Sequence, residues 1–257
     1  MLRSLLICGL IAGVLGGLLA TGFARGVGEA AVDQAIAFEG ARAAAAGEPA
    51  EPALVSRSTQ KSFGLLTAAV VFGLSIGGLF ALAFAAVYGR VGRASPARTA
   101  LWLAAAAYVI VFLVPFIKYP SNPPAVGDPD TIGRRTGLYV CMIVISLLAA
   151  YIALRLRATY ARRRTASTAT LLAVATYAAI VLVAGLVLPA VHEVPADFPA
   201  ATLWRFREST VGMQAILWTT IGLVFAGLAP RVMAGKSILP RRTRPKDAES
   251  PANAGLS

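Results

Sequence analysis

Histidine, cysteine and charged residues are all scarce in this sequence. It has one histidine and two cysteines in 257 residues, and 14% of its residues are charged, where a soluble domain has about 25%. Cys8 and Cys141 each lie inside an apolar run and form no CxxC motif, so neither a disulfide framework nor a zinc site is predicted. Walker A, GxSxG and HExxH motifs are absent. We therefore expect no enzyme activity, no catalytic or cofactor-binding residue and no permanently bound cofactor.

Long apolar runs dominate what is present. Residues are 57% hydrophobic, mean hydropathy is +0.70, and runs of about 20 apolar residues, the length that crosses a bilayer, recur. We predict an all-α polytopic membrane helix bundle over residues 1–230, with six spans near residues 4–23, 63–88, 100–117, 137–154, 169–189 and 211–228. The first span is either a retained helix or a signal peptide, and cleavage would leave five spans.

Three connections are expected to be exported: residues 24–61, 118–136 and 190–210. The first of these is predicted to hold a short interfacial helix followed by a loop. Residues 231–257, which are basic and rich in Pro and Ser, are predicted to be a disordered cytoplasmic tail.

Glycines recur at four-residue spacing in the first two spans. Gly9, Gly13 and Gly17 follow this spacing in the first span, and Gly73 and Gly77 follow it in the second. Such GxxxG patterns allow close approach of helices in lipid. The alternative is chance, because Gly and Ala are common throughout the chain.

Charge is distributed unequally between the two sets of connections. The N-terminus, the 89–99 and 155–168 loops and the tail carry fifteen basic and two acidic residues, whereas the exported loops carry nine basic and ten acidic residues. Basic loops stay in the cytoplasm, so both termini are expected there. The same rule accounts for the net charge of +12 without a nucleic-acid partner.

Two exported loops hold the candidate metal-binding residues. The stretch KYPSNPPAVGDPDTIGRR (118–135) contains four prolines, which make it stiff, together with Asp128 and Asp130. His192, Glu193 and Asp197 lie within six residues of one another in the other loop. Imidazole and carboxylate groups suit cobalt, nickel or zinc. The alternatives are a polar turn and a lone histidine at the water interface.

Other polar residues are expected to have structural roles. Arg205 and Arg207 are expected at the headgroup level, with Trp204 as an interfacial anchor. The middle of each span lacks Asp, Glu and Lys, groups that proton- or sodium-coupled carriers usually place there.

The two loops resemble the CbtA family of predicted cobalt transporter subunits. The similarity lies in FIKYPSNPPAVGDPDTIGRRTGLY (116–139) and LPAVHEVPADFPAATLWRFREST (188–210), and it extends over most of residues 1–230. The matching positions are Lys118, Tyr119, Pro120, Asn122, Pro123, Pro124, Gly127, Asp128, Pro129, Arg134, Arg135, Glu193, Pro195, Phe198, Pro199, Trp204, Arg205, Phe206 and Arg207. In the family an acidic residue is common where His192 stands.

The resemblance implies a role in cobalt transport. It implies a multi-pass protein of the bacterial inner membrane, associated with cobalamin genes, with cobalt as substrate. It also implies a small one-span partner subunit that carries histidines.

Three hypotheses follow for the function. The first is a subunit of a cobalt or other divalent-ion importer, in which Asp128, Asp130, His192, Glu193 and Asp197 collect the ion outside. The second is a scaffold or metal-binding accessory subunit that transports nothing, which the apolar middle of the spans favours. The third is a membrane enzyme that uses Asp128 and Asp130 as acid and base. We expect the two candidate loops to face one another.

Overall fold

The computed structural model describes residues 1–47, 56, 59, 63–124, 126–127 and 129–236, and these residues form helices and turns without a strand. The elements are α1 (Leu2–Phe23), η1 (Ala24–Gly28, π-helical), α2 (Glu29–Ala45), α4 (Leu65–Val87), α5 (Pro96–Ala107), η3 (Tyr108–Leu113, π-helical), α6 (Val114–Lys118), η4 (Pro129–Thr131, a 3-10 turn), α7 (Ile132–Tyr160), α8 (Ala166–Val187) and α9 (Ala200–Met233). Six continuous helical stretches among them are long and apolar enough to cross a membrane. The predicted all-α bundle of six spans is therefore confirmed.

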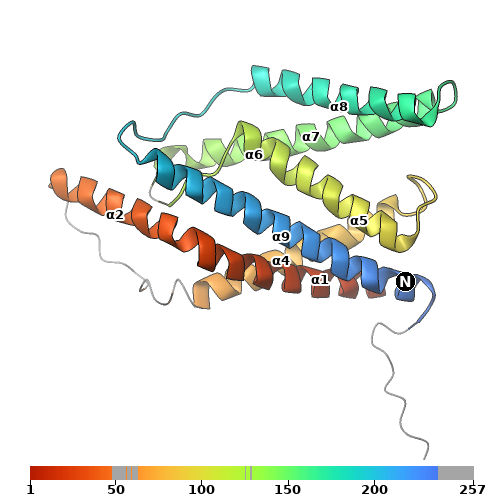
Figure 1. The fold of residues 1–257 in the computed structure, drawn as a ribbon, viewed down its shortest axis with the longest axis horizontal. Helices are drawn as coiled ribbons and strands as arrows, with labels where there is room; N and C mark the ends of the chain where they lie inside the picture. Colours follow the sequence, from red (N-terminus) through yellow and green to blue (C-terminus); the bar gives the residue numbers. More distant parts are fainter. Residues whose placement is uncertain (48–55, 57–58, 60–62, 125, 128, 237–257) are drawn as a thin grey trace, which may run out of the picture.

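The connections between spans alternate between two ends of the bundle (Figure 1). We call the end that carries segments 119–131 and 188–199 the pocket end. The opposite end carries segments 88–95, 161–165 and 234–236, and we call it the basic end. The N-terminus also lies at the basic end (Figure 1). Two of the three connections predicted to be exported thus lie at one end, while the predicted tail beyond residue 236 lies outside the described residues.

The first span continues without a break into the segment predicted to hold a separate interfacial helix. Residues Leu2–Ala45 form a single stretch of 44 residues, which at 1.5 Å per residue is about 66 Å long, against a hydrocarbon core of about 30 Å. The predicted helix is present as α2, but it is not a separate element, because it extends α1 and packs along the start of α9. Thr202 Oγ1 donates to Gln34 Oε1 at 2.7 Å between these two helices. The polar loop predicted to follow it falls mainly in residues 48–62, most of which are not described.

The glycine pattern of the first two spans forms a direct contact between α1 and α4. A Cβ atom added to Gly13 would collide with the carbonyl oxygen of Gly73, and one added to Gly9 would collide with that of Gly77. The two backbones therefore touch, and the close-packing interpretation of the pattern is confirmed.

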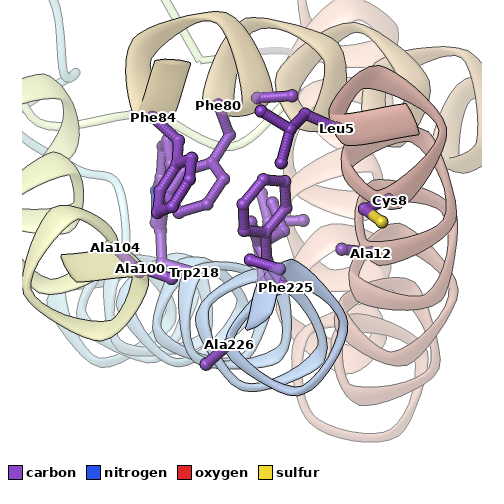
Figure 2. Packing of buried hydrophobic residues seen from close by; sticks show 14 of the residues in the cluster. Leu5, Cys8, Ala12, Phe80, Phe84, Ala100, Ala104, Trp218, Phe225 and Ala226 are labelled. Atoms are coloured by element: carbon purple, nitrogen blue, oxygen red, sulfur yellow. The ribbon is translucent and has the colours of Figure 1, made fainter. Parts of the chain in front are cut away.

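An aromatic core joins α1, α4 and α9. The Phe225 ring of α9 lies 4.9 Å from the Phe84 ring and 5.1 Å from the Phe80 ring of α4, between ring centroids. Leu5 of α1 packs into the same cluster (Figure 2). Since α1 supplies buried side chains to this cluster, the first span is a structural part of the bundle.

Helices α7 and α8 form the far side of the bundle (Figure 1). Ser146 Oγ and the Tyr177 hydroxyl are 2.8 Å apart and hydrogen-bond across the pair. Much of the remaining surface of α8 is apolar and exposed, with Leu186 and Val187 both 77% exposed. Such a surface suits contact with lipid chains.

A widened turn in the third span directs the chain into the pocket end. Pro115 has no N–H group to donate to the carbonyl of residue 111, and its ring crowds that carbonyl. The preceding turn, η3, is π-helical, and the N–H of Val114 bonds to the carbonyl of Val109. The helix then ends at Lys118, and Tyr119 leaves it with non-helical backbone angles, φ -127° and ψ 75°.

Candidate functional site

The two predicted loops meet at the pocket end through hydrogen bonds between residues distant in sequence. The Tyr119 hydroxyl donates to the carbonyl of Pro189 at 2.8 Å. Burial raises the pKa of Tyr119, so its hydroxyl keeps the proton that it donates. Ser121 Oγ donates to Thr210 Oγ1 at 3.3 Å. The expectation that the loops face one another is confirmed.

Arg207 joins α9 to the proline-rich loop. Its Nε donates to the carbonyl of Ser121 at 3.3 Å, and its Nη2 donates to Asn122 Oδ1 at 3.1 Å. The side chain is half-buried. Arg207 therefore contacts the loop, and its place at the headgroup level stays a prediction, while Trp204, on the same helix, is 64% exposed.

A half-buried ion pair links α7 to the second loop. Arg135 Nε lies 3.0 Å from Glu193 Oε2, and the two side chains are 26% and 16% exposed. The atoms are not aligned as a hydrogen bond, so the attraction is mainly one of charge. Gly127 lies over this pair with φ +117°, and a Cβ there would be 2.7 Å from Arg135 Nη1.

A small apolar cluster holds the pocket end together. Ala35 of α2, Val126 of the first loop and Phe198 of the second are buried against one another. The rings of Phe38 and Phe198 meet edge to face with centroids 5.1 Å apart. An aromatic contact of this kind adds about 0.5–1.5 kcal/mol beyond area burial. The loops are thus packed segments, as the prolines of the first loop predicted.

These contacts enclose a pocket of about 780 Å³. Its walls come from the end of α6, the first turns of α7, the segment after α8 and the start of α9. The lining residues are Ile117, Lys118, Tyr119, Pro120, Ser121, Asn122, Ile132, Arg135, Thr136, Tyr139, Ala190, Val191, His192, Glu193, Val194, Leu203 and Arg207. The volume falls in the range of about 300–1,000 Å³ that is usual for small-molecule sites.

Four of the five predicted metal ligands lie among the described residues, and these four do not form one cluster. His192 and Glu193 line the pocket, whereas the Asp197 side chain, 67% exposed, points to Arg42 with Oδ1 3.8 Å from Nη1. Asp130 has an exposed side chain in η4, and Asp128 lies outside the described residues. Among the residues that are described, no three His, Cys, Asp or Glu side chains gather closely enough to hold a metal ion.

Comparison with protein families shows what the chain is similar to. The family model described as "Probable cobalt transporter subunit (CbtA)" matches residues 2–230. This is most of the chain and includes every side chain of the pocket.

The chain belongs to the CbtA family.

Membership makes this CbtA chain a transporter subunit, with cobalt as the associated metal and a multi-pass membrane location. The designation as a subunit also implies that further subunits assemble with it. Comparison with the curated proteins and with the solved structures found no match in either set.

The basic residues of the pocket are the part of this CbtA site that sequence reasoning missed. Arg207 was expected at the headgroup level and Arg135 was named only among the positions that match the family, yet both line the pocket. One signal was available in the sequence: Leu203 and Arg207 are four residues apart and share a helix face, and both contact the pocket.

Proposed function

We propose that this chain is the membrane subunit of an uptake system for cobalt or a related divalent ion, with its pocket end outside the cytoplasm. The family match over residues 2–230 carries the proposal. The pocket at one end of six spans supports it, because an importer needs a site that opens toward its substrate. The bacterial inner membrane is the proposed location, with both termini in the cytoplasm.

In this proposal the ion first contacts His192 and Glu193. An imidazole and a carboxylate are suitable donors for cobalt, and both side chains line the pocket. Asp130 and Asp197 lie at the pocket end and add negative charge there, and Asp128 is proposed to contribute in the same way. Two donors make an incomplete set, so a small one-span partner that carries histidines would supply the rest.

Cobalt uptake in cells tests this proposal. We expect a strain without the gene to lose most of its uptake of radioactive cobalt at limiting concentration, and the gene to restore it. His192→Ala should lower the restored uptake at least about tenfold, because one metal donor is lost, and Asp128→Asn should also lower it. Equal uptake with and without the gene would contradict the proposal.

A scaffold or accessory subunit that does not transport is the second candidate. The apolar middle of the spans favours it, since no described carboxylate or lysine lies there to hold a dehydrated ion. Purified chain in liposomes, with and without the partner, separates the two candidates. Cobalt that binds but never enters the lumen, even with the partner present, would decide for the accessory subunit.

A further inference from the structure

The described lining of the pocket carries more positive than negative charge. Lys118, Arg135 and Arg207 face it, and Glu193 is the one carboxylate among its described walls. With His192 neutral, the formal balance is +2. A site built to hold a bare dication would show the opposite balance, because cations bind where carboxylate oxygens outnumber basic groups.

The three cations are only partly satisfied by protein groups. Two N–H groups of Arg207 donate to neutral oxygens, and no carboxylate of the described residues lies within ion-pair distance of its guanidinium. The Lys118 ammonium lies 5.7 Å from the centroid of the Tyr119 ring. Glu193 compensates Arg135 alone. Half-buried cations without counterions are costly, and an anion in the pocket would remove that cost.

The pocket has room for much more than a single hydrated metal ion. Six water molecules at about 30 Å³ each occupy about 180 Å³, whereas the pocket measures about 780 Å³. This space suits a small organic ligand. Ser121, Asn122 and Tyr139 add polar groups to the same walls.

We infer that this pocket is an oxyanion site that binds a ligand with several carboxylate or phosphate oxygens. Guanidinium groups bind such oxygens in pairs, and an ammonium adds a further charge-assisted contact. The inference rests on the proposed function in one respect: it implies that cobalt reaches the chain as an anionic chelate. The Arg and Lys side chains would hold the oxygens of the chelator, while His192 faces the metal. A phospholipid headgroup offers the same oxyanion chemistry.

Binding to the purified full chain in nanodiscs of phosphatidylcholine tests the inference, with calorimetry and four probes: citrate, inorganic phosphate, cobalt chloride and the cobalt–citrate complex. We expect citrate to bind without metal, and Arg207→Gln to weaken its affinity about tenfold. Lys118→Gln should also weaken it. Arg134→Gln is the matched control, because it removes the same charge from an exposed position outside the pocket lining. We expect it to change the affinity less than about threefold.

Glu193→Gln gives the sharpest contrast. If the pocket binds oxyanions, this change frees Arg135 and raises citrate affinity. If the pocket held the metal without an oxyanion, the change would lower the affinity for cobalt and citrate would not bind at all. Binding of cobalt chloride with no binding of citrate or of the cobalt–citrate complex would overturn the inference, and so would equal losses of citrate affinity in Arg207→Gln and Arg134→Gln.

A further arm separates the two sources of the oxyanion. Phosphatidylglycerol is anionic, so adding it to the nanodiscs repels citrate in general, and the change in citrate affinity of the Arg134→Gln variant measures this general effect. We expect no further change in the citrate affinity of the unaltered chain. If phosphatidylglycerol competes with citrate, and Arg207→Gln abolishes this competition, the pocket binds oxyanions. That result would nevertheless contradict the inference that the bound ligand is a metal chelate, because the lipid headgroup would be the ligand. Citrate binding without gene-dependent cobalt uptake would contradict the proposed function alone. Gene-dependent uptake without citrate binding would contradict this inference alone.

Discussion

Gly127, at the pocket end, combines a positive φ angle with close contact to charged side chains. Gly127 has φ +117°, a conformation that residues with a Cβ rarely adopt, and it lies directly over the Arg135–Glu193 pair. The position therefore constrains both the path of the loop and the placement of the ion pair.

We predict that Gly127→Ala destabilises the chain by about 1–3 kcal/mol, because alanine is strained at this φ and its methyl group displaces Arg135. Thermal unfolding in detergent should show the midpoint lowered by roughly 2–4 °C per kcal/mol. Gly133→Ala is the control, since that glycine is helical with nothing within 4 Å of an added Cβ. Equal shifts for the two variants would contradict this account of Gly127.

The residue scale also shows where sequence reasoning about the site stopped. The proline-rich loop, Glu193 and His192 were identified from residue type and spacing, and the structure places them around one pocket. The predicted link of Asp197 to the same site is not supported by its position facing Arg42. The basic character of the pocket was not foreseen, because it depends on which face of α9 presents Arg207 and on where α7 begins.

At the scale of elements, the contact between α1 and α4 has the least tolerance for change. Gly13 and Gly73 touch backbone to backbone, so no side chain can be added at Gly13 without separating the helices. The aromatic core beside them depends on the same separation.

We predict that Gly13→Leu destabilises the bundle at the upper end of overpacking costs, about 3 kcal/mol or more. The yield of monodisperse protein in size-exclusion chromatography and the unfolding midpoint should both fall. Gly22→Leu, in the same helix, meets open space and should leave both unchanged. A stable Gly13→Leu variant with a normal midpoint would show that α1 and α4 are not packed this way.

A second element-scale prediction concerns the cluster that fixes the loops. Phe198 is 6% exposed and packs on Phe38, so Phe198→Ala should cost about 3 kcal/mol locally. Hydrogen exchange should become faster in segment 190–199 and in α2 while the aromatic core stays protected. Phe72→Ala, at a position 50% exposed on α4, is the control. Faster exchange throughout the bundle would contradict a local role.

Most of the fold at this scale was predictable from the sequence, because a run of about 20 apolar residues can adopt few structures in a bilayer. The packing of the helical segments that extend the spans was not predictable. A helix was predicted in residues 24–61, but as a separate interfacial element, whereas the structure packs residues 29–45 along the start of α9, with the Gln34–Thr202 hydrogen bond between them. Hydropathy alone does not predict which two polar helical segments pack against each other.

For the whole molecule, the account depends on which end faces outward. The two candidate loops lie at one end of the six spans and the arginine-rich connections lie at the other (Figure 1). The pocket is at the end of the two loops, which supply part of its lining. Arginine-rich connections remain in the cytoplasm, so we expect the pocket to open to the outside. An importer with this pocket in the cytoplasm would meet its substrate on the wrong side.

Thiol labelling in intact cells tests this orientation most directly. Cys8 and Cys141 are first replaced by alanine, and single cysteines are then introduced as Ala190→Cys in the pocket wall and Ser167→Cys at the basic end. Retained cobalt uptake by each variant shows that it is folded. We predict that a membrane-impermeant maleimide labels Ala190→Cys in intact cells and labels Ser167→Cys only after permeabilisation. The reverse pattern would contradict the account.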